Sequence, residues 1–145
     1  MRIFKPIAVL ALLAWICAAC GVDNPATISI TDAWMRPGIA GGNSAIYFTV
    51  ENLSDREEVL QGTQGDIAEA YELHRTTISE DDMMSMHHQM SIPIAANEQL
   101  LFEPGGLHVM VINLKRDVDE GEIIPLVLKF KTAGEIKLDV PVKQE

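Results

Sequence analysis

Cysteine and basic residues are both scarce in this chain of 145 residues, and each scarcity excludes a class of protein. The two cysteines, Cys17 and Cys20, stand near the N-terminus, so the rest of the chain offers neither a disulfide framework nor a thiolate ligand. Only 11 Lys and Arg oppose 21 Asp and Glu, which gives a formal net charge of −10. The chain therefore lacks the basic footprint of a nucleic-acid-binding protein, and no nucleic-acid partner is expected.

Helical patterning is also missing. No segment combines a sustained 3.6-residue hydrophobic period with caps at both ends. Short runs rich in β-branched and aromatic residues recur instead, with Gly, Pro and Asn turn signals between them. The expected strands cover residues 27–35, 45–50, 57–61, 98–102, 107–114, 122–131 and 135–142. This spacing predicts one all-β domain over residues 27–145, either a sandwich or a barrel.

Two segments fit this strand pattern poorly. Residues 67–74 are compatible with either a helix or a strand, because their alanines and glutamates favour helix while alternate residues would share one strand face. Residues 76–89 show no strand signal, so a long loop is predicted there. Loops of that length in compact domains are usually functional or mobile.

The N-terminal segment has the features of an export signal. Arg2 and Lys5 precede an apolar run, residues 7–17, that is too short to span a membrane, and small residues follow it. Residues 1–19 are therefore predicted to be cleaved, with residues 20–26 as a tether. Cys20 resembles the lipid-bearing cysteine of bacterial lipoproteins, so we expect an exported protein of the periplasm or cell envelope, anchored to the membrane through Cys20. Cleavage without lipidation is the alternative.

Histidine and methionine are concentrated in one quarter of the chain. All four histidines and five of the seven methionines lie between residues 74 and 110. These residues are His74, His87, His88 and His108, with Met83, Met84, Met86, Met90 and Met110. Thioether sulfur is a soft, uncharged ligand that selects Cu(I), and imidazole suits copper as well. The concentration predicts a copper site.

The expected strand at residues 107–114 would place two of these residues side by side. Alternation puts Leu107, Val109 and Val111 on the core face and leaves His108 and Met110 together on the other. Two side chains in that relation can reach one ion. The alternative is that Met110 only fills the core and that His108 is an edge residue with satisfied hydrogen bonds.

The methionines that follow the acidic residues 80–82 have no apolar period that would bury them as a helix face. They form either a ligand-bearing loop or a disordered, Met-rich surface segment. His87 and His88, with Asp81 and Asp82 nearby, offer harder nitrogen and oxygen donors. A second, Cu(II)-preferring site is therefore predicted on this loop, with Met83, Met84 and Met90 as further possible ligands.

His74, eleven intervening residues, Met86, twenty-one intervening residues and His108-x-Met110 resemble the His-x10-Met-x21-His-x-Met motif of the PCuAC periplasmic copper chaperones. The first interval is one residue longer than in that family, and Ser85 stands at the family spacing, so Met84 competes with Met86 for the role. The resemblance implies a cupredoxin-like Greek-key β-sandwich or barrel. It also implies a Cu(I) site of His74, Met86, His108 and Met110.

The same resemblance implies that the protein delivers Cu(I) to a copper-accepting protein, either a cytochrome c oxidase subunit or another copper chaperone. We expect a monomer and no enzyme, because no nucleophile elbow, zincin helix or phosphate loop is present. A blue-copper electron carrier is excluded, since it needs a cysteine thiolate. The remaining alternatives are an envelope protein that buffers copper or confers resistance to it, and a non-catalytic β-sandwich interaction module.

Overall fold

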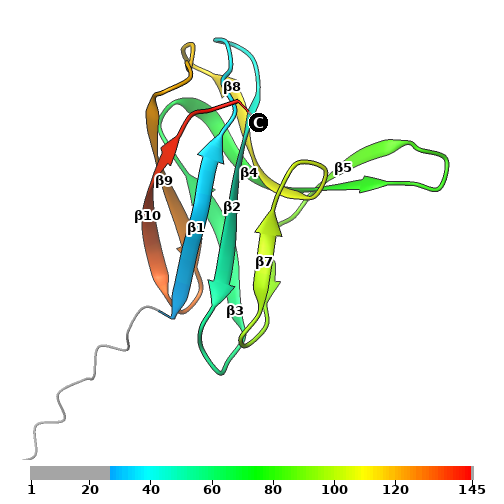
Figure 1. The fold of residues 1–145 in the computed structure, drawn as a ribbon, viewed down its shortest axis with the longest axis vertical. Helices are drawn as coiled ribbons and strands as arrows, with labels where there is room; N and C mark the ends of the chain where they lie inside the picture. Colours follow the sequence, from blue (N-terminus) through cyan, green and yellow to red (C-terminus); the bar gives the residue numbers. More distant parts are fainter. Residues whose placement is uncertain (1–26, 145) are drawn as a thin grey trace, which may run out of the picture.

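The computed structural model describes residues 27–144 and confirms the predicted all-β class. The expected leader and tether, including Cys20, lie outside these residues. Ten strands make up the described part of the chain, which contains no helix (Figure 1). The strands are β1 Ile28–Met35, β2 Ser44–Asn52, β3 Glu58–Gln64, β4 Ala68–Ile78, β5 Met84–His88, β6 Ile92–Ile94, β7 Gln99–Phe102, β8 Leu107–Leu114, β9 Ile123–Phe130 and β10 Gly134–Pro141. Nothing within residues 27–144 is a helix long and apolar enough to cross a membrane.

The strands form two sheets. One has the order β1-β2-β7-β8-β4-β5, with a further pairing of β2 and β8, and the other has the order β10-β9-β3-β6. Pairing is antiparallel except between β7 and β8. Strand β8 therefore lies inside the larger sheet, between β2 and β7 on one side and β4 on the other. Its backbone is therefore paired with other strands on both sides.

The hydrophobic core lies between the two sheets. Val109 and Val111 of β8 are fully buried, as are Leu126 and Leu128 of β9, and Phe48 of β2 is 2% exposed. Burying a side chain of this size contributes about 1.5–3 kcal/mol to the free energy of unfolding. The predicted apolar face of residues 107–114 is thus confirmed, and it fixes which side chains of β8 point away from the core.

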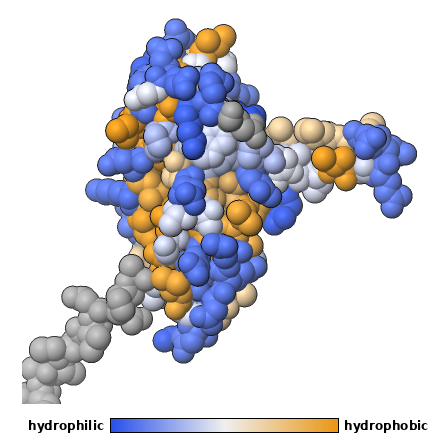
Figure 2. Space-filling view, in the orientation of Figure 1, coloured by the Kyte–Doolittle hydropathy of each residue, from blue (hydrophilic) through white to orange (hydrophobic). Residues whose placement is uncertain are grey.

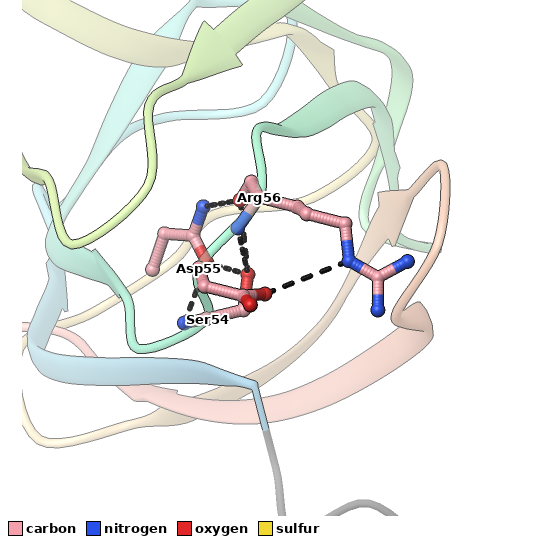
Figure 3. Close-up of polar contacts among 4 residues, drawn as sticks. Ser54, Asp55 and Arg56 are labelled. Atoms are coloured by element: carbon pink, nitrogen blue, oxygen red, sulfur yellow. Dashed lines mark hydrogen bonds and ion pairs between the residues drawn. The ribbon is translucent and has the colours of Figure 1, made fainter.

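The turn between β2 and β3 is closed by short polar contacts. Asn52 Nδ2 donates to the carbonyl oxygens of Arg56 and Ile94, at 2.7 and 3.1 Å. Figure 3 shows the neighbouring contacts, in which the Ser54 hydroxyl donates to the Arg56 carbonyl at 2.9 Å. Asn52 is completely buried, so these bonds satisfy an amide that would otherwise be costly to bury.

The segment predicted to be a long loop is instead a β-hairpin, so that prediction was wrong. Strand β4 runs on to Ile78, and β5 pairs with it in antiparallel register. The turn between them is closed by a hydrogen bond from Ser79 N to Met83 O at 2.9 Å, and Asp82 adopts a positive φ of 57°. Residues 76–89, called the arm below, extend away from the sandwich (Figure 1).

The strand structure of the arm leaves no pattern in the sequence, because the arm buries almost nothing. Every residue of β5 is exposed, so no alternation of apolar and polar residues was required to form it. Backbone pairing with β4 stabilises it instead. Residues 68–74 of the ambiguous segment also belong to β4, where pairing with β8 decides for strand over helix. Strand β6 was not predicted, since it has only three residues.

Candidate metal centre

The two histidines of the predicted site face each other across β4 and β8. His74 is directly opposite His108 in the antiparallel register, and their ring centroids are 5.8 Å apart. Opposed residues of neighbouring strands point to the same face of a sheet, here the face away from the core. The Tyr47 ring lies 6.4 Å from His108 on the other side. His108 is 5% exposed and stands on a central strand, not at an edge as one alternative had it.

Met110 joins this face from β8, as alternation predicted. It lies two residues beyond His108 and is opposite Glu72 of β4. Met110 is half-buried, whereas its neighbours Val109 and Val111 are fully buried. Met110 therefore does not belong to the core, and its thioether stands beside the imidazole of His108.

Strand β5 brings the arm methionines to the same face. Met86 is opposite Thr76, and Met84 is opposite Ile78, so both methionines project on the side that carries His74. Met86 is 54% exposed and Met84 is 66% exposed. Both methionines project to this face, but Met86 is two residues along β5 from the position opposite His74, whereas Met84 is four.

A cleft of about 430 Å³ collects these side chains. Its lining includes Met84, Met86, His108 and Met110, which are three of the four predicted ligands and the competing methionine. His74 is not part of this lining; it lies next to it, in ring contact with His108. The cleft is therefore lined by three thioethers and one imidazole, and a second imidazole, that of His74, neighbours the first.

A hydrogen bond of His108 determines which of its ring nitrogens carries hydrogen and which has a lone pair. Its Nδ1 is 3.2 Å from the Gly106 carbonyl oxygen, which can only accept a hydrogen bond. Nδ1 therefore carries the hydrogen, and Nε2 has the lone pair. Burial lowers the pKa of His108 below 6.5, and the nearby His74 and Arg36 act in the same direction, against the opposing effect of the Gly106 bond. The ring is thus held neutral, which is the form that binds a metal ion.

His74 is held by a carboxylate that the sequence did not single out. His74 Nε2 lies 2.9 Å from Glu72 Oε2, and the two side chains are 14% and 39% exposed. His74 Nδ1 is buried and has no hydrogen-bond partner among the described residues. The available sequence signal was the i, i+2 spacing of Glu72 and His74, which becomes informative only once residues 68–78 are known to be a strand.

The predicted second site is not gathered in the structure. His87 and His88 are consecutive on β5, so alternation points them to opposite faces, and Asp81 and Asp82 belong to the turn at the tip of the arm. His88 lies instead against His74, with ring centroids 5.7 Å apart. Met83 and Met90 flank β5 and are 69% and 87% exposed. Within residues 27–144, no group of three or more His, Cys, Asp or Glu side chains could hold a metal ion.

Most of the described chain resembles proteins that are already known. A family model described as "LpqE-like: Putative lipoprotein LpqE-like" matches residues 28–142. A "Putative lipoprotein" of Leifsonia xyli subsp. xyli is 24% identical over 98% of this chain and 90% of its own length.

Solved structures agree on the fold. The copper-bound PCuAC domain from PmoF2 superimposes with a TM-score of 0.69 at 23% identity, covering 82% of this chain and 94% of that domain. The Cu(I) form of DR1885 from Deinococcus radiodurans has a TM-score of 0.58 at 26% identity, covering 80% of this chain and 79% of the other. The predicted cupredoxin-like β-sandwich is confirmed by these neighbours.

Proposed function

This chain belongs to the LpqE-like family and has the fold of PCuAC domains, and from that premise we propose that it is a Cu(I) carrier of the cell envelope. Two of the similar structures are described as copper-bound, one of them as a Cu(I) form. A lipoprotein relative supports membrane attachment, for which Cys20 is the candidate residue. Two acyl chains or more would make such an anchor stable, because one chain alone binds a membrane only marginally.

The proposed ligands are His74, Met86, His108 and Met110. One observation carries this choice: the opposed imidazoles of His74 and His108 share a sheet face with Met110, and Met86 reaches that face from the arm. Two neutral nitrogens and two thioether sulfurs form a soft set that favours Cu(I) over harder ions. Such a set also avoids thiolates, which form disulfides in an oxidising compartment.

The unequal burial of these ligands suits transfer. His108 and Met110 stand on a strand whose other face is fully buried, so they are fixed in place. Met86 is 54% exposed on an arm whose strand β5 pairs with β4 at the edge of the larger sheet. Displacing one thioether at the exposed end would open the site to a ligand of an acceptor. The proposed acceptor is a copper protein such as a cytochrome c oxidase subunit or another copper chaperone, and the protein catalyses no reaction.

Competition with a chromophoric cuprous chelator tests binding directly. We expect one Cu(I) per chain, and X-ray absorption of the loaded protein should count two sulfur and two nitrogen neighbours. The double variant His74→Ala/His108→Ala should keep the fold but no longer compete with the chelator for Cu(I). Failure of the wild-type protein to compete with a weak chelator would overturn the proposal.

Delivery is separated from storage by a transfer assay. The Cu(I)-loaded protein is mixed with an apo copper-accepting domain of cytochrome c oxidase, and the two are separated and analysed for copper. A carrier gives up its ion faster than the ion dissociates into a chelator alone. A buffering protein, the alternative function, would transfer copper no faster than this spontaneous release.

A further inference from the structure

The neutral imidazole of a histidine has one nitrogen with hydrogen and one with a lone pair, and only the second can bind a metal ion. Which nitrogen is bare is set by the hydrogen bond that the other one makes. In this structure the two proposed histidine ligands are held by different partners, through different nitrogens. The pair is therefore not symmetric.

The contact at His74 is with a side chain. Glu72 Oε2 lies 2.9 Å from His74 Nε2, and a carboxylate oxygen accepts hydrogen bonds. Nε2 must then carry the hydrogen, which leaves the lone pair on Nδ1. This is the reverse of His108, whose Nδ1 donates to the Gly106 carbonyl and whose Nε2 is bare.

Independent evidence comes from the other nitrogen of His74. Nδ1 is one of two buried side-chain nitrogen or oxygen atoms in the described part of the chain that lack a hydrogen-bond partner. Leaving a buried acceptor unpaired is unfavourable, because the nitrogen loses its hydrogen bond to water and gains none in the protein. A bound ion would satisfy this nitrogen, whereas a structural role for His74 would not explain why it is bare.

We propose that Glu72 is a positioning residue for copper: it accepts the Nε2 hydrogen of His74 and so presents Nδ1 of that ring, beside Nε2 of His108, to the ion. This inference rests on the proposed Cu(I) site and deepens it. Glu72 is two residues before His74 on the same face of β4 and opposite Met110 of β8, so it adjoins two proposed ligands without being one. Its negative charge also offsets part of the charge of the bound ion.

The first test needs no copper. Long-range ¹H–¹⁵N correlation spectra of the apo protein at a fixed, neutral pH report which nitrogen of each histidine carries hydrogen. We expect the Nε2–H form for His74 and the Nδ1–H form for His108. The Glu72→Ala variant should lose the preference at His74 and keep it at His108. An Nδ1–H form of His74 in the wild-type protein would overturn the inference.

The second test measures Cu(I) affinity. Removal of a residue that orients a metal ligand typically weakens binding by about 10- to 100-fold. We expect that range for Glu72→Ala and a smaller loss for Glu72→Gln, whose amide oxygen can still accept the hydrogen. Glu69→Ala is the matched control, since Glu69 is an exposed carboxylate on the opposite face of β4.

The outcomes separate this inference from the carrier function. Because Cu(I) is diamagnetic, the same spectra of the loaded protein should show the ¹⁵N shift of His74 Nδ1 moving and that of Nε2 nearly unchanged. Tight Cu(I) binding by Glu72→Ala with an unaltered His74 tautomer would overturn the role of Glu72 and leave the carrier standing. Absence of Cu(I) binding by the wild-type protein would overturn the carrier, while the apo tautomer of His74 would still decide whether Glu72 orients the ring.

Discussion

His74 and His108 stand directly opposite each other on β4 and β8, with ring centroids 5.8 Å apart, although 33 residues separate them in the chain. Their rings are held by different acceptors, the Glu72 carboxylate and the Gly106 carbonyl. Everything proposed about copper binding depends on this opposition. These two ligands come from neighbouring strands within the larger sheet, whereas Met86 comes from the exposed arm.

Met86 and Met84 form a matched pair of variants that decides which methionine completes the site. Along β5, Met86 is two residues from the His88–His74 pair and Met84 is four, a difference of about 6–7 Å at the usual strand rise. Met86→Leu should therefore weaken Cu(I) binding by tenfold or more, and Met84→Leu should have a much smaller effect. Chelator competition measures both. A reversed order would assign the ligand role to Met84.

Cu(I) affinity should fall as the pH is lowered from neutral to about 5. A histidine must be neutral to bind the ion, and an ordinary histidine titrates near pH 6.5. Burial lowers the pKa of His108, so this ligand stays neutral further into the acid range than a free histidine would. The fall should then be gradual and steepest toward the acid end. Affinity that did not change over this interval would exclude His74 and His108 as ligands.

The same shift predicts an effect on the apo protein. His108 has a lower pKa folded than unfolded, so below pH 6.5 the unfolded chain binds the proton first. The free energy of unfolding should decrease as the pH falls from 6.5 through the folded-state pKa, and be unaffected by this group above 6.5. Urea unfolding across the range measures the slope. His108→Asn should reduce this slope. An identical slope in that variant would show that the lowered pKa of His108 is not its cause.

Glu58 should stabilise the smaller sheet. Its buried carboxylate accepts backbone N–H bonds from Val59 at 2.8 Å, Thr132 at 3.0 Å and Ala133 at 2.7 Å. Burial alone would raise the pKa of Glu58, but these donors outweigh it and the pKa is lowered. Its contribution is therefore present at neutral pH and lost as the pH falls through the folded-state pKa.

Glu58→Gln should lower the free energy of unfolding by about 1–3 kcal/mol, because the charge-assisted bonds weaken and one donor loses its acceptor. Urea denaturation at neutral pH measures the difference. Glu57→Gln, at an exposed neighbouring position, is the control and should change little. Equal stability of the two variants would contradict the role given to Glu58.

A Cu(II)-preferring site on the arm stays a prediction. It should appear as additional Cu(II) bound beyond the first equivalent, and the double variant His87→Ala/His88→Ala should lose it. Since the two rings project to opposite faces of β5, the single variants need not be equivalent. His88→Ala should have the larger effect, because His88 lies 5.7 Å from His74. Unchanged Cu(II) stoichiometry in the double variant would contradict the prediction of a second site on the arm.

Much of the fold was readable from local patterns. Alternation over residues 107–114 set Val109 and Val111 against His108 and Met110, and the structure has that division. The rule works there because one face of the strand is buried, so a shift of register by one residue would expose the apolar side chains to water. It failed over residues 76–89, where every residue of β5 is exposed and backbone pairing with β4 forms the hairpin.

By itself the sequence determined the kinds of donor available: imidazole and thioether in abundance, and no cysteine beyond Cys20. That follows from composition and needs no geometry. Only the tertiary structure decided which donors meet, since opposition of His74 and His108 depends on long-range strand pairing that no local pattern encodes. The tertiary structure also placed the side chains of His87 and His88 on opposite faces of β5 and set Glu72 in contact with His74. These relations follow from the sheet, which assigns the two faces of each strand.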